Sequence, residues 1–367
     1  MAGLQVSLVS FAQCGGIVHY STSLANALAR HLPVRVLVPD GADTSGYDPD
    51  VEVVYLPVPM DCSAREICRA PSRMIQFPRV LRALEGPQDH IVHFLNRHEY
   101  LTFAAPLVHS RLVVTMHDPR PHRGEASPRK LLANGTLRRQ ARRILVFGNI
   151  LKQHLVEQGV PEGRITVVPH GSFSRYACAP QSVPEQPPIG LFFGRILPYK
   201  GVNVLLQAAP LIREQVPEFR LLIAGEGDVR PYRALLDREL ATGHCELINR
   251  FVSDEEMGTL LARSSVILLP YLEATQSGVV PLAYGAQRPV IATAVGAIPE
   301  IIDSGRTGLL VPPDDAPALA ASTVKLLSDP KLAGEVACAG RIYAEEHLSW
   351  EAVAESTIPV YEEIAAL

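Results

Sequence analysis

The sequence predicts an α/β protein built from two domains, each with a doubly wound, mostly parallel sheet. Short apolar runs alternate with amphipathic helical stretches along most of the chain. Such alternation is typical of parallel strands joined by crossover helices. The alternating series occurs twice, on either side of a stretch rich in serine, proline and glutamine. A length of 367 residues also suits two domains of roughly 100–200 residues each.

The first series consists of short apolar runs that we interpret as strands. They are Gln5–Phe11, Val34–Val38, Val51–Leu56, Ile91–Leu95, Leu112–Met116, Ile144–Phe147 and Ile165–Val168. The stretches between them with helical periodicity are Val18–His31, 71–86, 127–143 and 149–158. This series predicts an N-terminal domain over residues 1–171.

The second series predicts a C-terminal domain over residues 189–347, after a linker at 172–188. Its expected strands are 189–193, 219–224, 245–248, 265–270, 289–292 and 309–311, and a helix is expected from Val202 to Ile212. Residues 348–367 contain a final helix, Trp350 to Ala366, which we expect to pack back on the body of the protein. Whether this helix also bridges the two domains is left open. Two facing domains predict a cleft between them, which is a favoured place for a ligand.

Composition and charge exclude several classes of protein. The net charge of −4 does not favour a nucleic-acid partner, which requires a basic domain. No apolar run approaches the 18 or so residues of a membrane span, and Met1 to Phe11 has no basic leader or cleavage site. The six cysteines form no CxxC pair, which favours reduced thiols. We therefore expect a cytoplasmic protein.

One loop carries the strongest signal for a ligand site. The apolar run that ends at Phe193 is followed by Gly194, Arg195, Lys200 and Gly201, and then by a predicted helix. The two cations therefore lie at the carboxyl edge of a sheet, where ligands bind in open α/β folds. A helix start also favours anions, so this loop suits a diphosphate. Taken alone, two solvated loop cations would explain the same residues.

Two features of the first domain are weaker. Gly15 and Gly16 follow the first predicted strand and allow a ligand to approach the backbone closely, although a tight strand–helix turn explains them equally well. His117 follows the strand Leu112–Met116 and would point toward the ligand edge, but single histidines in loops are common. Neither feature decides a function alone.

A third stretch, after the strand 265–270, combines a carboxylate with a predicted helix start. Glu273 precedes Ser277, Gly278 and Val279, and a helix is expected to begin near Gly278. A carboxylate can accept from sugar hydroxyls, and free N–H groups can donate to phosphate. Ser277 as a simple N-cap with Glu273 as a nearby charge fits the same pattern.

The sequence does not predict a metal site. The run Asp48-Pro49-Asp50 precedes a predicted strand, and we interpret it as a turn. The histidines show no HExxH or Cys/His zinc spacing.

These motifs, in this order on two doubly wound domains, resemble the retaining nucleotide-sugar glycosyltransferases of the GT-B fold. This is the group 1 family, glycosyltransferase family four, which includes sucrose synthases and mannosyltransferases. The resemblance rests on Gly15-Gly16, His117, Gly194-Arg195 with Lys200-Gly201, and the Glu273 stretch, and it covers nearly the whole chain. It implies two Rossmann-like domains, with the acceptor on the first and the nucleotide sugar on the second.

The resemblance also implies roles for these residues. Arg195 and Lys200 are similar to the pair that binds the donor diphosphate, and Glu273 is similar to the acidic residue near the donor sugar hydroxyls. The loop at Ser277, Gly278 and Val279 is similar to the one whose backbone meets sugar and phosphates. His117 resembles the histidine beside the reacting sugar, and Gly15 and Gly16 the loop that admits diphosphate and acceptor. Retention without a metal or other cofactor is implied, with UDP or GDP as the expected donor nucleotide.

One position departs from the family pattern. The family's second glutamate, which usually holds the ribose, is replaced by Pro281, eight positions after Glu273. This places ribose anchoring and nucleotide preference in question. A nucleotide-sugar epimerase, a phosphorylase and a non-catalytic nucleotide-sugar binding protein therefore remain alternatives.

The acceptor is expected to be a sugar, a lipid or a natural product, and the sequence does not name it. The first domain contains many arginines and a lysine, which would form solvated helix faces or contact anionic lipid headgroups at a membrane. They are Arg65, Arg69, Arg73, Arg79, Arg82, Arg129, Lys130, Arg138, Arg139, Arg142 and Arg143. We favour the solvated faces. The donor sugar, the linkage and the oligomeric state are not predicted.

Overall fold

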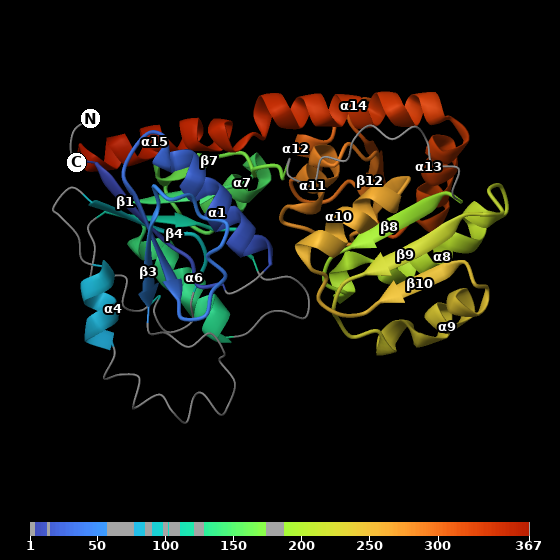
Figure 1. Cartoon of the computed structure of the whole chain (residues 1–367), viewed down its shortest axis with the longest axis horizontal. Helices are drawn as coiled ribbons and strands as arrows, with labels where there is room; N and C mark the ends of the chain where they lie inside the picture. The colour runs from blue at the N-terminus through green and yellow to red at the C-terminus, as the bar shows by residue number, and fades with distance from the viewer. Residues whose placement is uncertain are drawn as a thin grey trace. The chain divides into compact units, whose positions relative to one another are not determined.

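The computed structural model describes residues 4–12, 15–56, 77–84, 90–97, 102, 111–120, 128–173 and 187–366. The chain divides into two compact units. In Figure 1 the first unit is blue to green, except for its last helix, which is red like the end of the second unit. The first unit contains the described residues up to Gly171 and the last helix from Trp350, and the second runs from Ser172 to Ser349. Most of the predicted linker at 172–188, namely 174–186, lies outside the described residues.

The first unit is built on a parallel sheet. Its strands are β1 (Gln5–Val9), β2 (Val34–Pro39), β3 (Glu52–Leu56), β4 (His90–Phe94), β5 (Leu112–Thr115), β6 (Arg143–Val146) and β7 (Ile165–Val167). In the described part of this unit the seven strands follow the order β3-β2-β1-β4-β5-β6-β7. The strands β1, β4 and β5 are buried almost throughout, because helices cover both faces of a parallel sheet.

The second unit repeats this plan. Its strands are β8 (Ile189–Phe193), β9 (Arg220–Ala224), β10 (Cys245–Ile248), β11 (Val266–Leu269), β12 (Val290–Thr293) and β13 (Leu309–Val311). Over the residues described here, these six strands are all parallel and follow the order β10-β9-β8-β11-β12-β13. The predicted α/β class with two doubly wound sheets is therefore confirmed.

The helices of the first unit are α1 (Gly16–Ala29), α4 (Phe77–Leu84), α6 (Pro128–Gln140), α7 (Asn149–Glu157) and α15 (Trp350–Ala365). Those of the second unit are α8 (Val202–Arg213), α9 (Arg233–Ala241), α10 (Asp254–Arg263), α11 (Val279–Gly285), α12 (Ile298–Ile301), α13 (Ala316–Ser328) and α14 (Pro330–His347). In the second unit, α13 packs against α8, and α14 packs against α11 and α13. The helix expected over 71–86 is observed as α4, with 71–76 and 85–86 outside the described residues.

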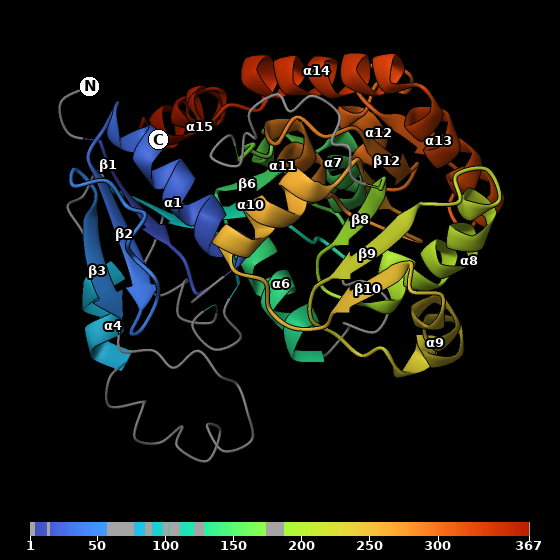
Figure 2. The ribbon, with the colours of Figure 1, turned by 45° about the vertical axis from the view of Figure 1, so that its right-hand side comes forward.

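The last helix, α15, belongs to the first unit. Figures 1 and 2 both show α15 alongside α1, and it also contacts β4. Its Tyr361 is fully buried, and the hydroxyl lies 2.6 Å from Nδ1 of His93. The Nε2 atom of His93 lies 2.7 Å from Oγ1 of Thr115 on β5. A buried polar chain thus connects α15 to two central strands.

Each sheet reverses its strand order once, and these reversals locate the candidate site. In the first unit the reversal lies between β1 and β4, and in the second between β8 and β11. Ligands of doubly wound folds bind beyond the carboxyl ends of the strands at such switch points. A ligand site is therefore expected at the loops that follow these four strands.

Among the described residues, none of the helices is both long and apolar enough to cross a bilayer.

Candidate functional site

The loop after β8 is shaped by two glycines with positive φ. Gly194 has φ +124° and turns the chain away from the strand, and the exposed Arg195 follows it. A 3-10 turn at Pro198–Lys200 ends at Gly201, which has φ +70° and precedes α8. A Cβ atom on Gly201 would lie 1.8 Å from the carbonyl oxygen of Pro270. Only glycine therefore allows this loop to approach the end of β11 so closely.

Lys200 of this loop contacts the loop after β11. Its ammonium nitrogen lies 3.8 Å from the ring centroid of Tyr271 and 5.2 Å from that of Tyr199. The Tyr271 ring is fully buried, whereas Lys200 is half-buried. An ammonium over the face of an aromatic ring is attracted by the ring's quadrupole. This contact holds a positive charge at the β8/β11 switch point.

Tyr271 also organises the rest of the β11 loop. Its carbonyl accepts a hydrogen bond from Oγ1 of Thr293 at 2.6 Å, and its hydroxyl accepts one from Oγ of Ser277 at 3.5 Å. The N–H of Leu272 donates to the carbonyl of Tyr199 at 2.8 Å, which joins this loop to the β8 loop. The two switch-point loops thus form one hydrogen-bonded assembly.

The start of α11 differs from the alternative in which Ser277 is a simple N-cap. Gly278, and not Ser277, occupies the N-cap position, and the helix begins at Val279. Ser277 is buried and its Oγ accepts the N–H of Val279 at 3.3 Å. Glu273 is half-buried in the preceding loop.

Pro281, at the expected ribose position, and Gln276 lie in the same region. Pro281 is buried in α11 and offers no side-chain acceptor. The buried Oε1 atom of Gln276 has no hydrogen-bond partner among the described residues.

In the first unit, Gly15 and Gly16 lie at the start of α1. Gly15 has φ +80° and occupies the N-cap position, and α1 begins at Gly16 rather than at Val18. A Cβ on either glycine would meet no described atom within 4 Å. The positive φ of Gly15 is therefore the feature that favours glycine here.

His117 follows β5 and is fixed by the chain after β4. Its Nε2 atom lies 2.9 Å from the carbonyl oxygen of Leu95. Burial lowers the pKa of His117, and the charge of Arg97 lowers it further, whereas Asp118 and the Leu95 carbonyl raise it. His117 is therefore neutral at pH 7. Because a carbonyl oxygen can only accept, the proton lies on Nε2 and Nδ1 is an acceptor.

An aromatic cluster packs around His117. The ring centroid of Tyr20 on α1 lies 5.3 Å from those of His117 and Trp350. Phe147 lies 5.0 Å from His117 and 4.9 Å from His170. Burial lowers the pKa of His170 to about 4, so it is a neutral part of the cluster.

A cavity of about 220 Å³ opens beside His117. Polar groups from three elements line it: Asn96 and Arg97 after β4, His117 and Asp118 after β5, and Asn134 on α6. The sequence predicted only His117 of these residues. Asn96 and Arg97 belong to no recognisable motif, and the only signal for them is their place directly after a strand at the β1/β4 switch point.

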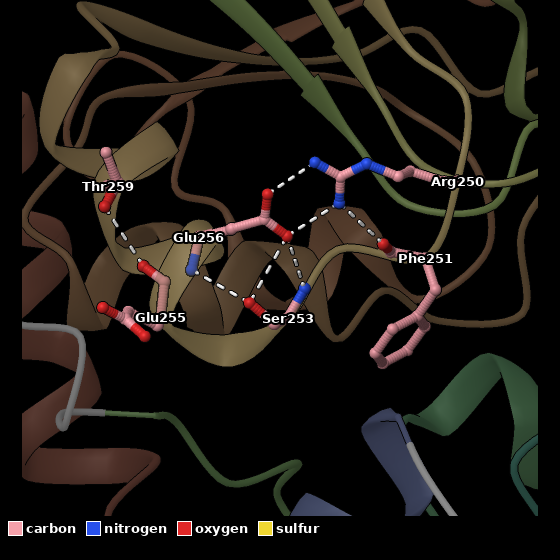
Figure 3. Close-up of polar contacts among 6 residues, drawn as sticks. All are labelled: Arg250, Phe251, Ser253, Glu255, Glu256 and Thr259. Atoms are coloured by element: carbon pink, nitrogen blue, oxygen red, sulfur yellow. Dashed lines mark hydrogen bonds and ion pairs between the residues drawn. The ribbon is translucent and has the colours of Figure 1, made fainter.

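A second cavity, of about 260 Å³, lies beside α10. Figure 3 shows the polar groups at the start of this helix. The guanidinium of Arg250 contacts both carboxylate oxygens of Glu256, at 2.6 and 2.8 Å, and lowers the pKa of Glu256 to about 2. Ser253 and Glu256 form a capping box. These groups satisfy one another, so they start a helix and do not form a ligand site.

The predicted Asp48-Pro49-Asp50 turn is observed. The N–H of Val51 donates to the carbonyl of Asp48 at 3.0 Å, as in a β-turn. Of the first-domain arginines, Arg65, Arg69 and Arg73 lie outside the described residues, as do the side chains of Arg79, Arg129 and Lys130. Arg138 bonds Gln158 and Arg143 pairs with Glu363, whereas Arg82 and Arg139 are exposed.

Family models match both units. Residues 15–171 match the glycosyl transferase 4-like domain, and residues 187–329 match glycosyl transferases group 1. The phosphatidyl-myo-inositol mannosyltransferase of Mycobacterium leprae is 30% identical over 375 residues, covering 97% of this chain and 95% of that protein. For several other curated relatives, the match spans about half the length of the relative or less.

Solved structures share the fold. Sucrose-phosphate synthase from Thermosynechococcus elongatus aligns over 99% of both chains with a TM-score of 0.79 and 20% identity. HepE from Anabaena, solved in complex with UDP-glucose, aligns over 99% of this chain and 100% of that chain, with a TM-score of 0.75 and 15% identity. Both likenesses support the GT-B architecture. Since a relative at 30% identity spans nearly the whole chain and family models match both units, this protein belongs to the group 1 glycosyltransferases.

Proposed function

We propose that this protein transfers a sugar from a nucleotide-diphosphate sugar to an acceptor hydroxyl, with retention of anomeric configuration and without a metal. One observation carries the donor half of the proposal: Lys200 lies at the β8/β11 switch point with its ammonium against the Tyr271 ring. Arg195 follows the same strand and is exposed. Two cations at this place suit a diphosphate, because ligands of such sheets bind at the switch point.

The chemistry requires stabilisation of a leaving group. Negative charge grows on the nucleoside diphosphate as the glycosidic bond breaks, and Arg195 and Lys200 would stabilise it. With two such cations the leaving group needs no divalent ion. We infer that no side chain forms a covalent intermediate and that the departing phosphate takes the acceptor proton on the face where the new bond forms. Glu273 and the Ser277–Val279 loop would hold the donor sugar.

His117 is suited to orient a hydroxyl. It is neutral, its Nε2–H is committed to the Leu95 carbonyl, and its Nδ1 can accept. A fixed acceptor of this kind reduces the rotational freedom of a reacting sugar, which is how positioning contributes to rate. Gly15 and Gly16 would leave space for the diphosphate and acceptor next to α1.

The relatives suggest classes of substrate. The M. leprae relative is named for mannosyl transfer to phosphatidyl-myo-inositol, and HepE was solved with UDP-glucose. A relative from Mycolicibacterium smegmatis is named as GDP-mannose-dependent. UDP- and GDP-sugars are therefore the donors to try first, and sugars, lipids and natural products the acceptors. A cytoplasmic location is part of the proposal, and liposome flotation with anionic lipid tests the alternative of peripheral contact with a membrane.

A donor panel tests the function directly. UDP-, GDP-, ADP- and dTDP-sugars are screened by thermal shift, because a bound donor stabilises the folded state by mass action. Donors that raise the melting temperature are then assayed with acceptors in EDTA, and the product's anomeric configuration is read by NMR. Transfer with retention in EDTA supports the proposal. Binding without transfer or hydrolysis favours a binding protein, donor turnover without an acceptor favours an epimerase, and inversion or loss of activity in EDTA rejects the mechanism.

A further inference from the structure

The polar cavity beside His117 lies wholly within the first unit, and it is small. Its volume of about 220 Å³ is below the roughly 300–1,000 Å³ typical of pockets for drug-sized ligands. A space of this size matches one sugar or cyclitol ring with a small substituent more closely than a whole nucleotide sugar. The cavity therefore suits an acceptor better than the donor.

A cation lines this cavity. Arg97 is half-buried, and among the described residues its guanidinium forms no hydrogen bond or ion pair. Its charge nevertheless reaches the neighbouring ring, since it lowers the pKa of His117. A guanidinium presents donors in a planar fork that matches phosphate and carboxylate oxygens. Arg97 thus marks a place for an oxyanion.

The other polar groups of the cavity suit hydroxyls. Oδ1 of Asn96 accepts the N–H of Phe11 at 2.8 Å, which leaves the amide N–H groups of Asn96 as donors. Asn134 donates to the Asp118 carbonyl at 3.3 Å, which leaves its Oδ1 as an acceptor. Nδ1 of His117 is a further acceptor. Acceptors beside one cation favour a ligand with several hydroxyls and one anionic group over a simple anion.

We propose that this cavity binds the acceptor, and that the acceptor is a polyol bearing a phosphate or carboxylate group that pairs with Arg97. The inference rests on the proposed function, because it names the acceptor class of that transfer. His117 then lies next to the hydroxyls of the bound polyol, and Arg97 sets which end of the polyol enters. Arg97 is a specificity residue of this site, and it contributes no step of the chemistry.

The experiment compares three probes on the wild-type protein: myo-inositol 1-phosphate, glucuronate and neutral myo-inositol. Binding is measured by calorimetry or ligand-observed NMR. We expect the phosphate or the carboxylate probe to bind at least tenfold tighter than neutral inositol, and the two charged arms identify which oxyanion is preferred. Equal affinity for charged and neutral polyols, or no binding of any probe, overturns the proposal.

Variants of Arg97 test whether this residue causes the preference for the charged probe. Arg97→Gln removes the charge and should abolish the preference for the charged probe, while Arg97→Lys should restore part of it. Arg139→Gln, an exposed arginine of α6, is the matched control and should keep the preference. A preference retained in Arg97→Gln, with folding verified by circular dichroism, would reject the role of Arg97. Donor binding is measured on the same samples, so a protein that binds charged polyols but no nucleotide sugar contradicts the proposed function and not this site.

Discussion

The ammonium of Lys200 lies 3.8 Å from the ring centroid of Tyr271, so the loops after β8 and β11 meet through a charge on an aromatic face. The ring is fully buried and its backbone carbonyl is held by Thr293. A cation fixed in this way needs little reorganisation when negative charge develops beside it. The contact therefore makes Lys200 the first residue to test.

Replacing Lys200 by Met should lower kcat by about 10²–10³, because removing one preorganised charge-stabilising donor costs about 2.7–4 kcal/mol. Turnover is measured at saturating donor. Lys331→Met is the control, since Lys331 is 87% exposed and pairs only with Glu335 among the described residues. Turnover of Lys200→Met within threefold of wild type would remove Lys200 from the mechanism.

Tyr271 should act through Lys200. Tyr271→Phe keeps the ring and loses the hydroxyl contact to Ser277, so we expect nearly unchanged kcat/KM. Tyr271→Leu removes the ring and should lower kcat/KM by about 2- to 30-fold, which corresponds to a cation–π contribution of about 0.5–2 kcal/mol. The double variant with Lys200→Met separates this effect from packing: the loss caused by Tyr271→Leu should largely disappear there. A loss of equal size in both backgrounds would mean that the ring serves packing alone.

The close approach at Gly201 predicts that alanine costs more unfolding free energy there than at Gly243, a glycine with a similar φ. Gly201 and Gly243 have φ of +70° and +73°, but a Cβ would meet the Pro270 carbonyl only at Gly201. Gly243→Ala should cost about 1–2 kcal/mol of unfolding free energy, the usual cost of a left-handed residue. Gly201→Ala should cost about 2–5 kcal/mol, because overpacking is added. Denaturant unfolding checks this, and equal losses would contradict the close approach.

Most strands could be predicted from the sequence, because an apolar run bounded by glycine and proline is recognised from the local pattern alone. Its boundary errors are local too: α1 begins at Gly16 because Gly15, with its positive φ, takes the N-cap position that the sequence placed later. Arg97, Asn96 and Tyr271 could not be predicted as site residues, since their roles depend on which strands become neighbours. The order β3-β2-β1-β4 places the chain after β4 beside that after β1, and this order is a property of the whole sheet.

The buried histidines predict a dependence of stability on pH. His93 is fully buried between Tyr361 and Thr115, and burial lowers its pKa to about 3, whereas that of an unfolded chain is about 6.5. Between these values the unfolded state binds more protons. The contribution of His93 is therefore complete above about pH 6.5 and is lost as the pH falls toward 3.

We expect the unfolding free energy of the wild type to decrease below about pH 6.5, with His93 contributing at most ~1.4 kcal/mol per pH unit. His93→Gln removes this proton while keeping groups that can hydrogen-bond, so its stability should be lower at about pH 7 but should fall less steeply between about pH 6 and 4. Burial also lowers the pKa values of His117 and His170, so some slope remains in the variant. His347→Gln changes a histidine whose side chain is 58% exposed and should leave the slope unchanged. Parallel pH profiles for wild type and His93→Gln would show that His93 is not held neutral by its burial beneath α15.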